Sequence, residues 1–78
     1  NIKNIFSIYP NPATNSIVIS NSESIDRVEI YDIKGGLIFR KSYQKKSTSI
    51  DLSNFTNGVY IVKVLSIKNT SVQKLIIE

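Results

Sequence analysis

The stretch Asp51-Leu-Ser-Asn-Phe-Thr-Asn-Gly-Val-Tyr-Ile-Val-Lys-Val64 decides how this chain is expected to fold. In residues 59–64, Tyr60, Val62 and Val64 alternate with Val59, Ile61 and Lys63, as on the two faces of a strand. The run is also rich in β-branched and aromatic residues, so it predicts a strand. Apolar residues lie on both faces at its start, as a central strand of a two-layer sandwich requires. Asn57-Gly58 immediately before the strand can take positive φ, so a sharp turn is expected there.

The first half of the same stretch predicts a closed corner. Leu52 and Phe55 are three residues apart, which suits one helical turn under a sheet, and Asp51 or Ser53 can accept its free N–H groups. Tyr60 follows at the start of the strand, the position of the tyrosine corner in immunoglobulin-like sandwiches, where the phenol bonds to upstream backbone. The alternative is that Tyr60 is only a large core residue.

Length and composition predict one small domain, residues 1–78, with an aliphatic core. The chain has no Cys and no His, so neither disulfides nor imidazole and thiolate metal sites support it. No apolar run approaches the roughly 18 residues of a membrane-spanning segment, so we expect no membrane insertion. No signal peptide is visible and the first residue is Asn, which indicates a piece of a longer protein. The net charge of +4 indicates solubility first and attraction to anionic partners second.

Short strand-like runs separated by polar turns follow one another along the whole chain. They cover residues 6–9, 17–19, 27–33, 37–43, 50–52, 59–65 and 72–77. We expect the polar segment 20–24 to be a turn after the run 17–19, and the polar segment 44–48 to be a loop after the run 37–43. Pro10 and Pro12 lack N–H donors and confine the first run to a sheet edge. The spacing predicts an all-β fold, a seven-stranded immunoglobulin-like β-sandwich of two antiparallel sheets.

Local patterns add a hairpin and a core. In Asp32-Ile-Lys-Gly35 the Asp should accept backbone hydrogen bonds and Gly35 should be left-handed, which predicts a hairpin with a bulge. The facing of 37–39 and of 75–77 stays open, because each run is continuously apolar. The side chains expected to face inward are Ile17, Ile19, Val28, Ile30, Ile50, Leu52, Tyr60, Val62 and Val64.

The residue types favour a protein without catalytic, cofactor or metal sites. Nucleophile–base pairs built on His or Cys are excluded. Asp32 and Asp51 could be considered as the catalytic carboxylate pair of a glycosidase. Both begin turns, however, where Asp is expected to accept hydrogen bonds from nearby backbone N–H groups. A basic cluster is interpreted as a solvated loop and not as a nucleic-acid platform, because it has no interleaved aromatics other than Tyr43. It consists of Arg40, Lys41, Lys45 and Lys46.

Four segments carry a further pattern. They are Ile8-Tyr-Pro-Asn-Pro-Ala-Thr-Asn15, Val28-Glu-Ile-Tyr-Asp-Ile-Lys-Gly35, Ile50-Asp-Leu-Ser-Asn-Phe-Thr-Asn-Gly-Val-Tyr60 and Lys74-Leu-Ile-Ile77. In this order and spacing they resemble the type A C-terminal sorting domain of the type IX secretion system of Bacteroidetes-type bacteria. The residues that carry the resemblance are Pro10, Asn11, Pro12, Tyr31, Asp32, Gly35, Asp51, Gly58, Tyr60, Lys74, Leu75, Ile76 and Ile77. Gly36 and Glu78 depart from the family pattern, which favours basic residues at both positions.

The resemblance implies a non-catalytic sorting signal that directs an upstream cargo protein across the outer membrane. It implies as partners the outer-membrane translocon, its shuttle proteins and a sortase-like cysteine peptidase that cuts ahead of the domain. The implied location is the periplasm in transit, then the cell surface or the medium.

The main alternative is an immunoglobulin-like accessory or spacer module that binds carbohydrate or protein. Such modules present rows of exposed aromatics, for which Tyr9, Tyr31 and Tyr43 are the candidates. An enzyme with an all-carboxylate site ranks below both. From the apolar final run we further expect weak self-association, and partner binding through the edge of the last strand.

Overall fold

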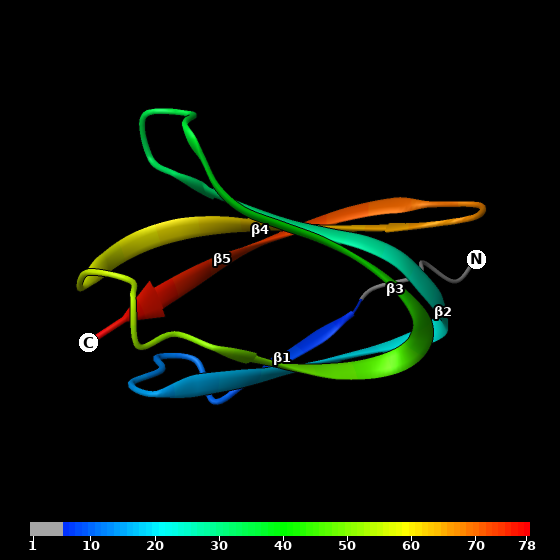
Figure 1. The fold of residues 1–78 in the computed structure, drawn as a ribbon, viewed down its shortest axis with the longest axis horizontal. Coiled ribbons are helices and arrows are strands. Elements are labelled where there is room, and N and C mark those ends of the chain that lie inside the picture. The colour runs from blue at the N-terminus through cyan, green and yellow to red at the C-terminus, as the bar shows by residue number, and fades with distance from the viewer. Residues whose placement is uncertain (1–5) are drawn as a thin grey trace.

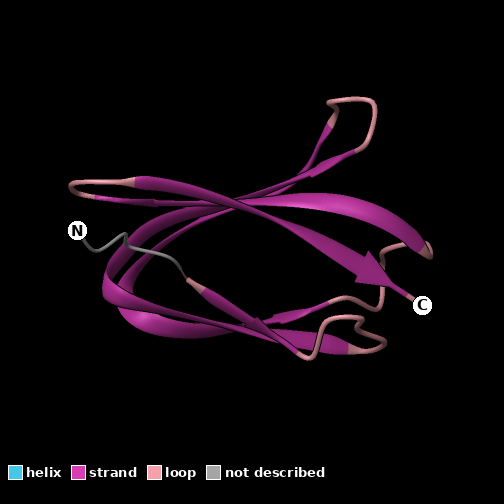
Figure 2. Ribbon diagram, turned by 180° about the vertical axis from the view of Figure 1, so that it is seen from behind, coloured by secondary structure: helices cyan, strands magenta, loops and turns pink. Residues whose placement is uncertain are grey.

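The computed structural model describes residues 6–78, which are built from β-strands joined by short turns (Figures 1 and 2). The strands are β1 (Ser7–Tyr9), β2 (Ser16–Asp32), β3 (Leu37–Asp51), β4 (Gly58–Ser66) and β5 (Thr70–Ile77). Their pairings are antiparallel and form one five-stranded sheet in the order β1-β2-β4-β5, with β3 also paired to β2. Within the described range, no helix has the length and apolar character that crossing a membrane would take.

The long strand β2 holds the sheet together because it pairs with β1, β3 and β4. Residues 16–20 pair with β1 and with the end of β3, whereas residues 25–32 pair with β4 and with the start of β3. Register shifts between residues 20 and 27 mark the bend at which β2 and β3 pass from one layer to the other. Figure 1 shows both strands curling round the right-hand end, so the sheet folds over on itself.

The sequence predicted seven strands in two sheets, but the structure has five strands in one curled sheet. The runs 17–19 and 27–33 lie in β2, and the runs 37–43 and 50–52 lie in β3. The segments 20–24 and 44–48, expected to be a turn and a loop, are strand instead, because two neighbouring strands that bend together keep pairing across the bend. The polar composition of residues 44–47 reflects an outer surface, since all four are exposed, whereas Asn21 in the other segment is buried and donates to the Glu23 carbonyl.

The core predicted from strand alternation is confirmed, because every side chain expected to face inward is buried. The facing left open for the final run is now settled, with Leu75 and Ile77 in the core and Ile76 on the opposite face. Further members of the buried cluster are Phe6, Ala13 and Ile25. An aliphatic core thus fills the inside of the curled sheet.

The turn between β2 and β3 has the predicted structure. Gly35 has a φ of 92°, and its N–H donates to the Asp32 carbonyl at 3.0 Å. The Asp32 carboxylate accepts from the N–H groups of Lys34 at 3.0 Å and Gly36 at 2.8 Å. The carboxylate therefore holds the turn by satisfying two backbone donors.

The predicted bulge follows directly after this turn. Tyr31 lies opposite Leu37, but Ile30 lies opposite Phe39, so Ile38 is the extra residue. Leu37 and Ile38 are exposed, whereas Phe39 packs against the core. The bulge explains why the alternation of this apolar run could not be assigned from the sequence.

The corner before β4 is closed by Tyr60, as predicted. Its hydroxyl donates to the Thr56 carbonyl at 2.6 Å and lies 3.1 Å from Thr56 Oγ1. The ring also meets Phe55 edge-on, with the centroids 5.6 Å apart. Gly58, between Thr56 and Tyr60, has a φ of 154°, a conformation that other residues rarely adopt. Tyr60 is therefore both a core residue and the lock of the corner.

Replacing Tyr60 with Phe should lower the free energy of unfolding by about 1 kcal/mol, because the hydrogen bond from this buried side chain to the Thr56 carbonyl is lost. Tyr9→Phe is the matched control, since the side chain of Tyr9 is half exposed at the surface. Urea unfolding of the two variants measures the difference. Equal unfolding midpoints would show that the hydroxyl does not hold the corner.

Candidate recognition site

The four segments that carry the sequence pattern lie toward one end of the molecule. Residues 10–15, the turn 51–58 and the end of β5 lie on the left in Figure 1 near the C-terminus, and the turn 32–36 projects at the top of the same side. The turn between β4 and β5 lies at the opposite end, and Figure 2 shows the same division from behind. The topology therefore gathers residues that are far apart in the sequence.

Asn11 and Ala13 join the first of these segments to the last. The side-chain amide of Asn11 donates to the Lys74 carbonyl at 2.9 Å, and its Oδ1 accepts from the Ile76 N–H at 3.0 Å. The Ala13 N–H donates to the Ile76 carbonyl at 2.8 Å, and its carbonyl accepts from the Glu78 N–H at 2.8 Å. The Asn11 side chain thus replaces a strand backbone where the two flanking prolines offer no N–H.

This arrangement changes the interpretation of the final strand. Leu75 and Ile77 are 0% and 3% exposed, so a partner cannot contact their side chains in the folded domain. Lys74 is exposed and Ile76 is half-buried on the other face. The expectation that this end of the strand offers a free edge is wrong, because Asn11 and the residues after it already cover that edge.

The turn-starting carboxylates bond locally and do not form a pair that could carry chemistry. Asp51 Oδ1 accepts from the Ser53 N–H at 2.9 Å, and the Phe55 N–H donates to the Leu52 carbonyl at 2.9 Å, which closes the expected turn. The backbone N–H and then the hydroxyl of Ser53 hold the pKa of Asp51 below its usual range. In the described residues, no group of three or more His, Cys, Asp or Glu side chains could hold a metal ion.

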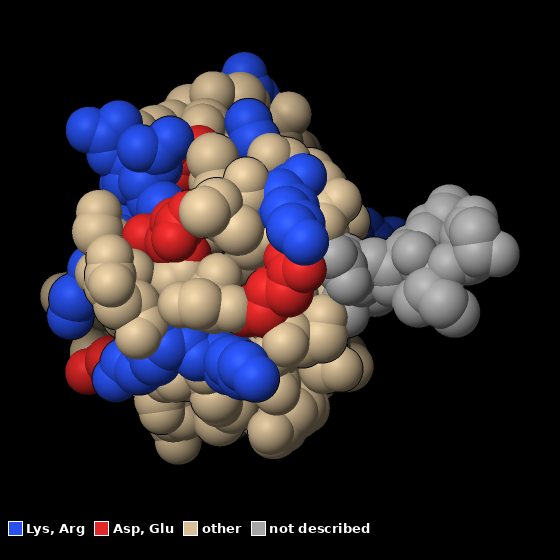
Figure 3. All heavy atoms as spheres, turned by 90° about the vertical axis from the view of Figure 1, so that its right-hand side faces the viewer, with Lys and Arg blue, Asp and Glu red and all other residues tan. Residues whose placement is uncertain are grey.

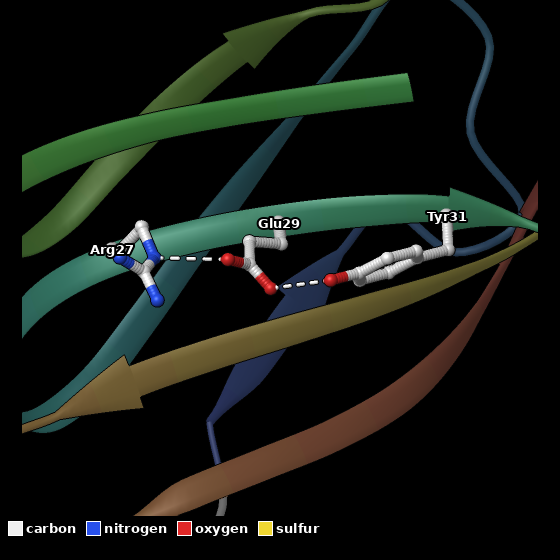
Figure 4. Close-up of polar contacts among 3 residues, drawn as sticks. All are labelled: Arg27, Glu29 and Tyr31. Carbon is white, nitrogen blue, oxygen red and sulfur yellow. Dashed lines mark hydrogen bonds and ion pairs between the residues drawn. The ribbon is translucent and has the colours of Figure 1, made fainter. Parts of the chain in front are cut away.

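Sequence reasoning missed a line of polar side chains along β2. Figure 4 shows Arg27, Glu29 and Tyr31 side by side on that strand. Arg27 Nε lies 2.9 Å from Glu29 Oε2, and the Tyr31 hydroxyl donates to Glu29 Oε1 at 2.6 Å. The Glu29 side chain is only 7% exposed. A charged pair and a Tyr at every second position of a strand is the signal that could have revealed it.

The surroundings of Glu29 stabilise its ionised form. The hydrogen bond from Tyr31 holds the pKa of Glu29 below its usual range; burial opposes the shift, and the charges of Arg27, Lys63 and Arg40 add to it. The same hydrogen bond raises the pKa of Tyr31. Arg40 and Lys63 lie directly opposite Glu29 on β3 and β4. A general acid needs the reverse shift, so these surroundings do not favour a proton-donating role for Glu29, whose hydrogen bond and ion pair are both made within β2.

Replacing Glu29 with Gln should make the domain less sensitive to acid. A carboxyl group whose pKa is lowered by folding adds stability above its unfolded pKa of about 4.3, and that stability is lost as the pH falls through the lower folded pKa. From pH 7 to about pH 3, wild-type protein should therefore lose more unfolding free energy than Glu29→Gln.

The exposed Asp26, changed to Asn, serves as the control and should retain the steep acid response of the wild type. Urea unfolding at several pH values measures all three proteins. Parallel pH profiles for wild type and Glu29→Gln would contradict the role assigned to Glu29.

Comparison with known proteins relates this arrangement to a family. Residues 7–78 match the family model described as a secretion system C-terminal sorting domain. The chain is 34% identical over 73 residues to ulvan lyase NLR42 of Nonlabens ulvanivorans. It is 30% identical over 70 residues to β-agarase D of Zobellia galactanivorans. Each alignment covers 90% of this chain but 14% of the relative, so the chain corresponds to a small part of each.

Two solved structures share the fold. PorZ, a surface component of the type IX secretion system of Porphyromonas gingivalis, has a TM-score of 0.76 at 19% identity and is matched over 94% of this chain and 11% of its own. A DUF3244 family protein from Bacteroides vulgatus, with an immunoglobulin-like β-sandwich fold, has a TM-score of 0.68 at 15% identity over 88% of this chain and 82% of its own. With its family match over residues 7–78, the chain belongs to the secretion system C-terminal sorting domains.

Proposed function

We propose that this domain is the export signal of a larger protein and directs its cargo through the type IX secretion system across the outer membrane. The observation that carries the proposal is the family match over residues 7–78. The chain covers 14% of two relatives whose names are those of polysaccharide-degrading enzymes. We infer the same arrangement here, a small sorting domain joined to a much larger and unrelated cargo.

The fold suits a signal that must work behind unrelated cargo. Gln73, near the start of β5, donates through its side chain to the Phe6 carbonyl, so the described chain begins on the side of the β4–β5 turn. The four pattern segments lie at the other end. Cargo joined ahead of the domain would leave that end accessible, and the core would fold without help from the cargo.

The partners that we infer are the translocon of the outer membrane, its shuttle proteins and a sortase-like cysteine peptidase that cuts ahead of the domain. Export would proceed through the periplasm to the cell surface or the medium. The domain itself would contribute recognition and not catalysis. The local engagement of Asp32, Asp51 and Glu29 supports this, since each accepts hydrogen bonds from its own strand or turn.

The alternative of a carbohydrate-binding module finds no support in the three candidate tyrosines. Tyr31 is half-buried and donates to Glu29, and Tyr43 is half-buried with the Lys41 ammonium 5.6 Å from its ring centroid. Tyr9 is exposed but belongs to β1, which pairs with the other half of β2. The three side chains therefore do not present the exposed row that such a module uses.

A reporter placed between a signal peptide and residues 1–78 tests the proposal in a type IX-competent cell. The reporter should reach the cell surface, and deletion of Val72–Glu78 should leave it in the periplasm, because most of β5 is lost. Ile67→Asp is the control and should export normally, since this side chain is 82% exposed on the far turn. Surface delivery that survives the deletion would refute the proposed function.

A further inference from the structure

The outer edge of β3 is open, unlike the end of β5. Within residues 6–78, β3 pairs with β2 alone along its whole length. The edge of β5 is covered from Lys74 to Glu78 by Asn11 and Ala13. An uncovered strand edge presents a row of backbone donors and acceptors to another chain.

The hydrogen-bond pattern identifies which groups of β3 face outward. In an antiparallel ladder, successive residues turn their N–H and C=O groups to opposite sides. The Asp32 N–H donates to the Gly36 carbonyl across the β2–β3 ladder. The backbone N–H and C=O groups of Asp32, and of every second residue before it in β2, therefore point toward β3. The partners of these residues include Phe39 and Lys41, which therefore face β2. Arg40 and Ser42 alternate with them, so their backbone N–H and C=O groups point to the open edge.

The same alternation holds beyond the bend. The Leu52 N–H donates to the Asn15 carbonyl, so Asn15 and every second residue after it face β3. Their partners on β3 include Ile50 and Thr48. Ser47 and Ser49 consequently face outward, and the open edge extends over both halves of the strand.

The side chains along this edge are basic. Arg40 lies opposite Glu29, but that carboxylate is already engaged by Arg27 and Tyr31. Figure 3 shows separate groups of Lys and Arg around the end at which β2 and β3 bend, with acidic side chains between some of them, but β3 itself contains no Asp or Glu before Asp51. The exposed basic residues of β3 are Arg40, Lys41, Lys45 and Lys46.

The combination of a free edge and basic side chains selects one kind of partner. A second copy paired edge to edge through β3 would set cations beside cations, and lysines on edge strands are a known obstacle to such pairing. An extended segment rich in Asp and Glu would gain both the ladder hydrogen bonds and the ion pairs.

We propose that the outer edge of β3 over residues 39–47 is a docking strand for an acidic, extended segment of another protein. The proposal deepens the proposed function and rests on it for the biological role, since that partner would belong to the export machinery. The binding itself can be tested without reference to export.

A synthetic peptide of about ten residues that alternates Glu and Val is the probe, with a Lys–Val peptide as its counterpart. The 78-residue chain should bind the Glu peptide and not the Lys peptide. Ser42→Pro removes an N–H that faces the open edge, so it should abolish binding with little change in the urea unfolding midpoint. Ser42→Ala is the matched control and should bind normally. Lys41→Glu combined with Lys45→Glu should weaken binding about tenfold, because exposed ion pairs contribute up to about fivefold each.

Equal binding of the two peptides would overturn the inference, and so would full binding by a folded Ser42→Pro variant. Should that variant fail to fold, the charge-reversed variant decides, because its backbone is unchanged. The reporter fusion separates this inference from the proposed function. If the charge-reversed domain directs export as well as the unchanged domain, docking through β3 fails and the sorting function stands. If the unchanged domain directs no export, the sorting function fails and the peptide measurement alone decides the inference.

Discussion

The rest of the structure depends on the hydrogen bonds between the Asn11–Ala13 segment and the outer edge of β5, because they join the segment after β1 to the last strand. β1 pairs with β2, β2 with β4 and β4 with β5, and the bridge from Ala13 to Ile77 returns to the segment after β1. The strands thus close into a ring around an aliphatic core. A chain without Cys or His must rely on such closure and burial for its stability.

This closure also divides the surface by function. The end of β5 is occupied from within the domain, whereas β3 keeps a free and basic edge. Most residues of the family pattern act inside the fold: Asn11 caps a strand edge, Asp32 and Asp51 satisfy turn donors, and Tyr60 locks a corner. We infer that the pattern mainly specifies the shape of the domain, and that partners contact the surface which this shape holds in place.

Features governed by local physics were predictable from the sequence. Alternation identified the inward set, and Asp32 with Gly35 identified the hairpin, because each depends on neighbours along the chain. Distant pairing was not predictable. Whether residues 20–24 end a strand depends on a second strand that bends beside them, and the role of Asn11 depends on a carbonyl 63 residues away. The buried carboxylate of Glu29 needed the packing of three strands to be recognised.

Amide hydrogen exchange, measured residue by residue in the unaltered domain, tests the closure most directly. The N–H groups of Ile76 and Glu78 should exchange slowly, close to that of Val62 in the buried strand, because Asn11 and Ala13 cover them. The N–H groups that face outward on the open edge of β3 should exchange much faster. Fast exchange at Ile76 and Glu78 while Val62 stays protected would contradict the account, since the segment after β1 would then not be joined to β5.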